Sequence, residues 1–213
     1  MMTDKLTAVA NFVQTTMAGD QSGHGYDHIE RVVNLTRQLL AENPANGEIA
    51  LTAAYLHDCF DEKLTSDPDA ARARVTEQLT AIGYQPAAIT AILAIIDHMS
   101  FAANLEHHQQ LSPEGQLVQD ADRLDALGAI GIARTFAYGA VHGYAMYDPQ
   151  VRPRTNLTKA NYRQPETTIN HFYEKLFKLP EQMNTVTARR LGNERKQYMQ
   201  EFVAEFKAEW NEL

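Results

Sequence analysis

Apolar residues recur at intervals of three and four along most of the chain, the spacing of one face of an α-helix. Residues 3–18 and residues 27–43 both follow it, the second with Ile29, Val32, Val33, Leu35, Leu39 and Leu40. No segment alternates apolar and polar residues as a half-buried β-strand does. The pattern therefore predicts an all-α protein.

Helix-start signals refine this prediction in the middle of the chain. Asp67-Pro68 and Ser112-Pro113 each place a capping side chain before a proline, which suits the first helical position. Together with the apolar spacing they predict helices over residues 68–82 and 86–99, from 113 through Asp122, and over 128–136, 167–179 and 181–211. Residues 139–164 contain Gly, Pro, Tyr and Asn with few apolar residues at helical spacing, which predicts a long irregular loop.

The most apolar of these segments, residues 48–60, ends in His57 and Asp58. Consecutive helical residues point about 100° apart, so both can hold one ion only if it lies at the helix surface. His28 and Asp122 are further candidate ligands, 29 residues before His57 and 64 residues after Asp58. Spacing alone does not require a metal, because a His-Asp pair also occurs by chance, with a solvated carboxylate at a helix end.

Two imidazoles and two carboxylates form a donor set that suits Mn²⁺, Fe²⁺, Co²⁺, Ni²⁺ or Mg²⁺ better than a structural zinc, which favours thiolates. Four protein ligands leave positions open on a six-coordinate ion. An ion of this kind can acidify a water and neutralise a phosphoryl oxygen.

Composition limits the alternatives. With 213 residues, 44% hydrophobic and 22% charged, the chain is typical of a soluble globular protein. The candidate ligands span residues 28–122 without a linker, so we expect one domain over residues 1–213. Its metal core would cover about 20–138, and the loop and C-terminal helices 139–213. The net charge of −8 argues against a general nucleic-acid-binding surface but permits a small phosphorylated ligand.

The single cysteine, Cys59, excludes an intramolecular disulfide and fits a reducing compartment. The first residues lack the apolar region of a signal peptide, and no apolar run is long enough for a membrane span. We therefore expect a cytoplasmic protein without a membrane partner. Phe202, Phe206 and Trp210 form an apolar stripe that suits either the core or the interface of a homodimer.

The informative sequence is not limited to the four candidate ligands but covers five stretches of the chain. They are residues 22–33 (SGHGYDHIERVV), 54–58 (AYLHD), 96–101 (IDHMSF), 118–134 (VQDADRLDALGAIGIAR) and 170–179 (NHFYEKLFKL). Together they resemble the HD-domain superfamily of metal-dependent phosphohydrolases, over roughly residues 5–210. Within it they are similar to a small bacterial branch that cleaves nucleoside triphosphates to monophosphate and pyrophosphate, with Mn²⁺ preferred.

The resemblance implies an all-α HD-domain helical bundle, with the metal site in the core and the C-terminal helices packed back on it. His28, His57, Asp58 and Asp122 would be the metal ligands. The final aspartate of the superfamily normally follows an alanine, as Asp122 does. Asp120 lies about 200° away around the helix and stays in reserve, because both cannot face one ion equally.

Superfamily members that hydrolyse alarmones carry an acidic pair four and five residues after the paired histidine. Here these positions are Asp61 and Glu62, acidic but in the opposite order. The resemblance implies that one of them deprotonates or orients the attacking water.

Basic side chains are needed to hold a polyphosphate, because positioning dominates phosphoryl-transfer catalysis. Arg31 shares a helical face with His28, His98 lies at a predicted helix end, and Lys175 and Lys178 are on the penultimate helix. These four are the predicted substrate-binding residues. Each is alternatively a solvated surface side chain.

The expected activity is hydrolysis of a (deoxy)nucleoside triphosphate to monophosphate and pyrophosphate, with a divalent metal as cofactor. The same ligands also serve a nucleotidase or a phosphodiesterase for a signalling nucleotide. A non-catalytic, metal-bound nucleotide sensor is the alternative from another class.

Overall fold

The computed structural model describes residues 4–18, 25–61, 65–158, 161, 164 and 167–211. Within these ranges the regular structure is helical and no strand occurs, which confirms the all-α prediction. The chain divides into two compact units, Met1–Ala121 and Asp122–Leu213, whose boundary falls inside helix α6. That the two units fold as a single domain stays a prediction.

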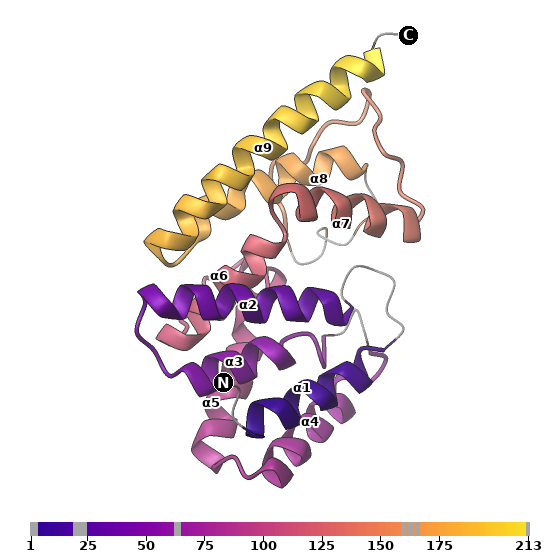
Figure 1. The fold of residues 1–213 in the computed structure, drawn as a ribbon. Coiled ribbons are helices and arrows are strands. Elements are labelled where there is room, and N and C mark those ends of the chain that lie inside the picture. The colour runs from indigo at the N-terminus through magenta and orange to yellow at the C-terminus, as the bar shows by residue number, and fades with distance from the viewer. Residues whose placement is uncertain are drawn as a thin grey trace. The chain divides into compact units, whose positions relative to one another are not determined.

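The first unit contains five helices and the beginning of a sixth among its described residues (Figure 1). They are α1 (Asp4–Thr16), α2 (Tyr26–Glu42), α3 (Gly47–Leu56), α4 (Pro68–Ile82), α5 (Pro86–Met99) and the start of α6 (Pro113–Asp125). A short 3₁₀ turn, η1 (Ala102–Asn104), follows α5.

Helix α3 is the centre of this unit. It packs against α1, α2 and α5, and six of its ten residues are buried, among them Ala50, Ala53 and Ala54. Such small side chains let neighbouring helices approach closely. The start of α3 is fixed by Asn46, whose side chain accepts a hydrogen bond from the Ile49 amide.

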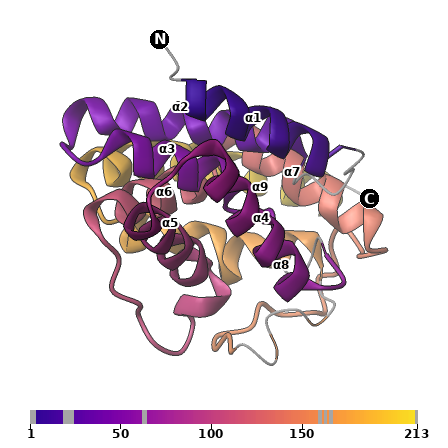
Figure 2. The ribbon, with the colours of Figure 1, turned by 90° about the horizontal axis from the view of Figure 1, so that it is seen from below.

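Helix α4 confirms its predicted bounds. Asp67 accepts a hydrogen bond from the Ala70 amide, and Pro68 occupies the first helical turn. Gly83 ends the helix in the left-handed region, at φ 91°, which side chains disfavour. Figure 2 shows α4 from below; it packs against α1 and α5.

The second unit continues α6 and adds α7 (Gly128–Val141), α8 (Thr168–Glu174), a 3₁₀ segment η2 (Leu176–Gln182) and α9 (Val186–Asn211). Its core joins α7, α8 and α9 through aromatic rings: Phe136 lies 6.4 Å from Phe172 and 5.9 Å from Phe202, between ring centroids. The stripe that the sequence left open, Phe202 and Phe206, therefore belongs to this core at least in part.

In the second unit, three predicted boundaries were wrong. Helix α7 continues past Phe136 to Val141, because Gly139 is small enough to pack directly against the Thr168 hydroxyl. The helix predicted over 167–179 stops at Glu174, and the chain then runs as a 3₁₀ segment through Pro180. Helix α9 consequently begins at Val186 and not at residue 181.

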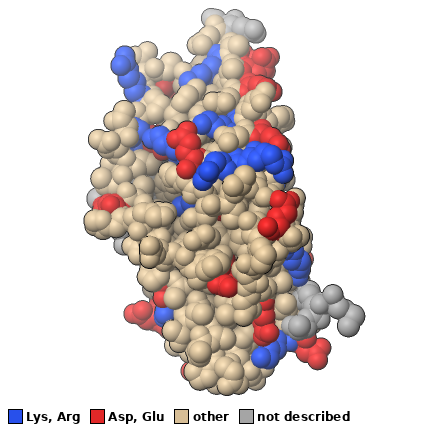
Figure 3. Space-filling model, turned by 90° about the vertical axis from the view of Figure 1, so that its left-hand side faces the viewer, with Lys and Arg blue, Asp and Glu red and all other residues tan. Residues whose placement is uncertain are grey.

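The charges are unequally divided between the units. Residues 1–121 hold 6 of the Lys and Arg residues and 16 of the Asp and Glu, whereas residues 122–213 hold 13 and 11. Figure 3 shows basic side chains gathered on one face of the second unit. Among the helices described, none is long and apolar enough to cross a membrane.

Candidate metal centre

His28 reaches the interior of the first unit because it belongs to the buried face of α2. It is fully buried, as are Ile29, Val32, Thr36 and Leu39 on the same face. His28 therefore sits where the helical periodicity would place an apolar residue. A polar group in that position needs a partner, since burial removes it from water.

His57 and Asp58 follow directly after α3, which ends at Leu56, earlier than the apolar run predicts. The chain turns there: the Cys59 amide donates to the Leu56 carbonyl at 2.9 Å, and the Asp61 amide to the Asp58 carbonyl at 3.2 Å. His57 keeps helical backbone angles, φ −58° and ψ −29°, and its side chain and that of Asp58 lie together with His28.

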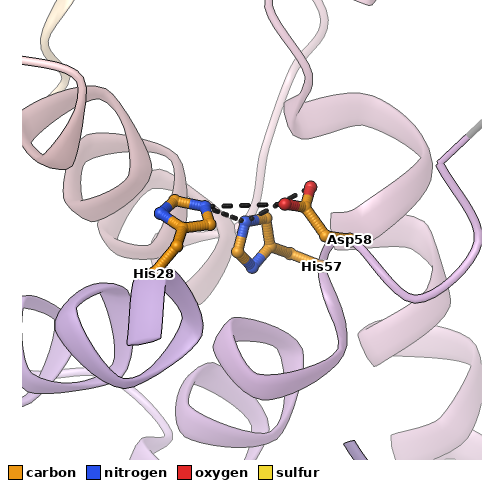
Figure 4. Close-up of side chains that lie close together, drawn as sticks. All are labelled: His28, His57 and Asp58. Carbon is orange, nitrogen blue, oxygen red and sulfur yellow. Dashed lines mark hydrogen bonds and ion pairs between the residues drawn. The ribbon is translucent and has the colours of Figure 1, made fainter. Parts of the chain in front are cut away.

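These three side chains meet in a compact triad (Figure 4). The Nε2 atoms of His28 and His57 are 3.1 Å apart. The Asp58 carboxylate lies 3.5 Å from Nε2 of His28 and 3.4 Å from Nε2 of His57. All three residues are buried, at 0%, 7% and 8% exposure. Neighbouring ligands on one six-coordinate ion stand about 3 Å apart, given metal–nitrogen distances of about 2.1 Å, so the separations fit a shared cation.

The hydrogen bonding of His57 supports this interpretation. Its Nδ1 lies 2.9 Å from the Ala54 carbonyl oxygen, an acceptor that requires an N–H at Nδ1. In the neutral ring, Nε2 then carries a lone pair directed toward His28 Nε2. That lone pair can accept a hydrogen bond from an N–H at Nε2 of His28, or it can bind a metal ion. The donor set fits a divalent metal.

Cys59 does not belong to this donor set in its native state. The side chain is buried, and burial, together with the nearby Asp58 charge, raises the pKa of the thiol to about 12. The three grouped side chains offer nitrogen and oxygen atoms only.

The two aspartates of α6 differ in burial. Asp120 is fully buried and belongs to the first unit, whereas Asp122 is half-buried and begins the second. That Asp122 is the fourth ligand stays a prediction.

Of the predicted acidic pair, Asp61 is described and Glu62 lies outside the described residues. Asp61 is half-buried, three residues after Asp58 in the same turn, and its carbonyl accepts from the Thr65 amide at 3.2 Å. Its amide donates to the carbonyl of Asp58, so the backbone of Asp61 is tied directly to a residue of the triad.

The predicted substrate-binding residues are spread over both units. Arg31 makes a 2.7 Å ion pair with Asp27 on the exposed side of α2, and this hydrogen bond lowers the pKa of Asp27. His98 is exposed at the end of α5. Lys175 is half-buried at the end of α8, and Lys178 is exposed. Their roles stay predictions.

One contributor to the site could not be found from the sequence. The Ala54 carbonyl fixes the orientation of His57, yet it is a backbone atom and leaves no trace in the residue types. Only the three-residue separation inside a helix end hints at such a contact.

Known proteins share the sequence pattern and the fold of this chain. The family model described as HD domain matches residues 25–127, a range that contains the triad and Asp122. A crystal structure from Lactobacillus plantarum is 49% identical, with a TM-score of 0.91 over 99% of both chains. A structure described as an HD-superfamily hydrolase from Bacillus thuringiensis is 39% identical, with a TM-score of 0.76 over 99% of this chain and 98% of that one.

The Bacillus subtilis protein YpgQ, described as uncharacterized, is 36% identical over 199 residues, which are 92% of this chain and 88% of YpgQ. A crystal structure of YpgQ in complex with ADP superimposes with a TM-score of 0.78 and 31% identity, over 97% of this chain and 98% of that one.

Proposed function

This chain belongs to the HD superfamily, and we propose from that premise that it hydrolyses a phosphoanhydride bond of a nucleotide with a divalent metal ion. The observation that carries the proposal is the buried triad of His28, His57 and Asp58, with its ligand atoms within 4.8 Å of one another. The nucleotide as ligand is supported by YpgQ, whose structure contains ADP.

The triad would hold the ion, and we propose Asp122 as its fourth ligand on the order of the sequence motif. When bound, a divalent ion of this kind supplies positive charge that acidifies a water and neutralises phosphoryl oxygens. Mn²⁺ is the first choice, on the resemblance to the bacterial branch; Mg²⁺, Fe²⁺, Co²⁺ and Ni²⁺ suit the same donors.

The remaining steps belong to the chain itself. Asp61, or Glu62 beside it, would accept a hydrogen bond from the attacking water and take its proton. Lys175, Lys178, Arg31 and His98 would hold the phosphates. The surplus of basic residues in the second unit supports a role for the two lysines, since a triphosphate needs several positive partners.

We propose that the water attacks the α-phosphorus of a (deoxy)nucleoside triphosphate. Its oxygen enters the monophosphate, and pyrophosphate leaves. A product assay tests this directly: purified protein with Mn²⁺ and a panel of nucleoside triphosphates, in water enriched in oxygen-18, followed by phosphorus NMR. We expect pyrophosphate without label and monophosphate with it.

Variants separate the site from the reaction. Asp58→Ala should reduce turnover by at least about 100-fold, the upper range for partners of a metal centre, and keep its helical content by circular dichroism. His107→Ala, an exposed histidine away from α3, is the matched control and should keep wild-type turnover. Orthophosphate as the product would retain the site and reject the pyrophosphohydrolase reaction. Full activity of Asp58→Ala would reject the site.

A further inference from the structure

Arg72, on α4, connects three parts of the first unit through one guanidinium. It forms an ion pair with Asp97 near the end of α5. The same group lies over the ring of Phe60, with Cζ 5.4 Å from the ring centroid. Phe60 is two residues after Asp58 and directly before Asp61, in the turn that carries both.

The partner on α5 is held in place. The Asn104 side chain donates to the carbonyls of His98 and Ser100 at 2.8 and 2.9 Å. The buried Gln119 of α6 donates to the Met99 carbonyl at 2.9 Å. Asp97 therefore belongs to a helix end that is fixed on two sides, and Arg72 is anchored to a rigid support.

The turn that follows α3 is closed by backbone hydrogen bonds, from Cys59 to Leu56 and from Asp61 to Asp58. Phe60 is only half-buried. A planar guanidinium fits this situation, because it can pair with a carboxylate through its edge and lie on an aromatic ring with its face.

We propose that Arg72 is a positioning residue: paired with Asp97 and stacked on Phe60, it fixes the turn that orients Asp58 toward the metal and Asp61 toward the water. The proposal rests on the proposed function for its catalytic consequence. Its consequence for metal binding is independent of any turnover. Small displacements of a reacting group are costly, since catalysis depends on near-attack geometry.

The test compares Arg72→Ala, Arg72→Lys and Asp97→Ala with the wild type, and Arg74→Ala as the control. Arg74 is exposed on the same helix, two residues away. Mn²⁺ affinity is measured by calorimetry, and kcat and KM with the best nucleotide substrate. Arg72→Ala should lower Mn²⁺ affinity and kcat by roughly tenfold each, at the low end for partners of metal ligands, with little change in KM.

The variants of the pair give the sharper prediction. Asp97→Ala should lower Mn²⁺ affinity and kcat as Arg72→Ala does. The double variant Arg72→Ala/Asp97→Ala should be no worse than either single variant, because both substitutions remove the same contact. Arg72→Lys should recover part of the metal affinity, since it keeps the charge but loses the planar stack. Arg74→Ala should match the wild type.

Two outcomes would overturn the proposal. If Arg72→Ala raises KM and Asp97→Ala does not, Arg72 holds the substrate phosphates directly. If both variants lower thermal stability but leave Mn²⁺ affinity unchanged, the pair only stabilises the fold. If the wild type has no turnover, the proposed function fails while the calorimetry still decides the role of Arg72.

Discussion

At the scale of single residues, Cys59 shows how strongly burial controls chemistry in this unit. Its pKa of about 12 leaves roughly one thiol in ten thousand ionised at pH 8. We therefore expect native protein to react with a disulfide reagent very slowly at pH 8, and to react at once with one thiol per chain after unfolding in guanidinium. Native labelling as fast as that of the unfolded chain would contradict the burial of this side chain.

The chemistry of the triad was predictable to the extent that it depends on residue types. The sequence predicted His28 as a candidate ligand in the helix over residues 27–43 and placed His57 beside Asp58 at the end of an apolar run, and the structure brings these three together. It could not reveal that α3 ends at Leu56, because the apolar pattern continues to Phe60. Residues of the turn contact parts of the chain distant in sequence: the Arg72 guanidinium lies over the Phe60 ring.

At the scale of elements, the long segment between α7 and α8 is fastened by a buried ion pair. Glu174 is 2% exposed, and its carboxylate accepts from the Arg154 side chain at 2.8 Å and from the Arg154 amide. The Asn170 side chain also donates to the Val151 carbonyl at 3.1 Å. The described residues around Val151 and Arg154 are therefore tied to α8, within a segment whose length and composition suggest a functional loop.

Glu174→Gln should loosen this segment, because it leaves the Arg154 charge without its carboxylate in a partly buried position. Breaking a buried pair costs about 3 kcal/mol, and we expect a lower melting temperature and faster cleavage by trypsin after Arg154, which precedes Thr155. Glu194→Gln is the control: it breaks the exposed Arg190–Glu194 pair, worth about 0.5 kcal/mol or less. Equal effects of the two variants would show that the pair does not hold the segment.

Element boundaries followed the sequence where the signal was local. Asp67, Pro68 and Gly83 define α4 through their own side chain or backbone preferences, and both ends were predicted. The end of α7 was not, because Gly139 reads as a helix breaker in isolation and becomes favourable only against Thr168. Pro180 likewise indicated a helix boundary, whereas a 3₁₀ segment accommodates it.

At the scale of the whole chain, composition predicted a globular protein but not the division of charge. A net charge of −8 conceals an acidic first unit and a slightly basic second one. The distinction matters for the proposed function, because a divalent cation would be favoured by an anionic environment and the phosphates of a nucleotide by a cationic one. The net charge of the whole chain does not show this difference between the two units.

Metal binding should appear in the stability of the chain, since an ion that binds only the folded state stabilises it by mass action. At a Mn²⁺ concentration of 100 times Kd the gain is about 2.7 kcal/mol, which raises the melting temperature of a chain of this size by about 5–10 °C. Excess EDTA should reverse the shift. Asp58→Ala should abolish it and the control His107→Ala should keep it; a shift that survives in Asp58→Ala would place the ion elsewhere.

The same measurement decides the last ligand, because Asp122→Asn should lose most of the shift if Asp122 binds the metal. If Asp120→Asn loses it instead while Asp122→Asn keeps it, the ligand is the buried aspartate of α6 and the assignment from the sequence motif is wrong.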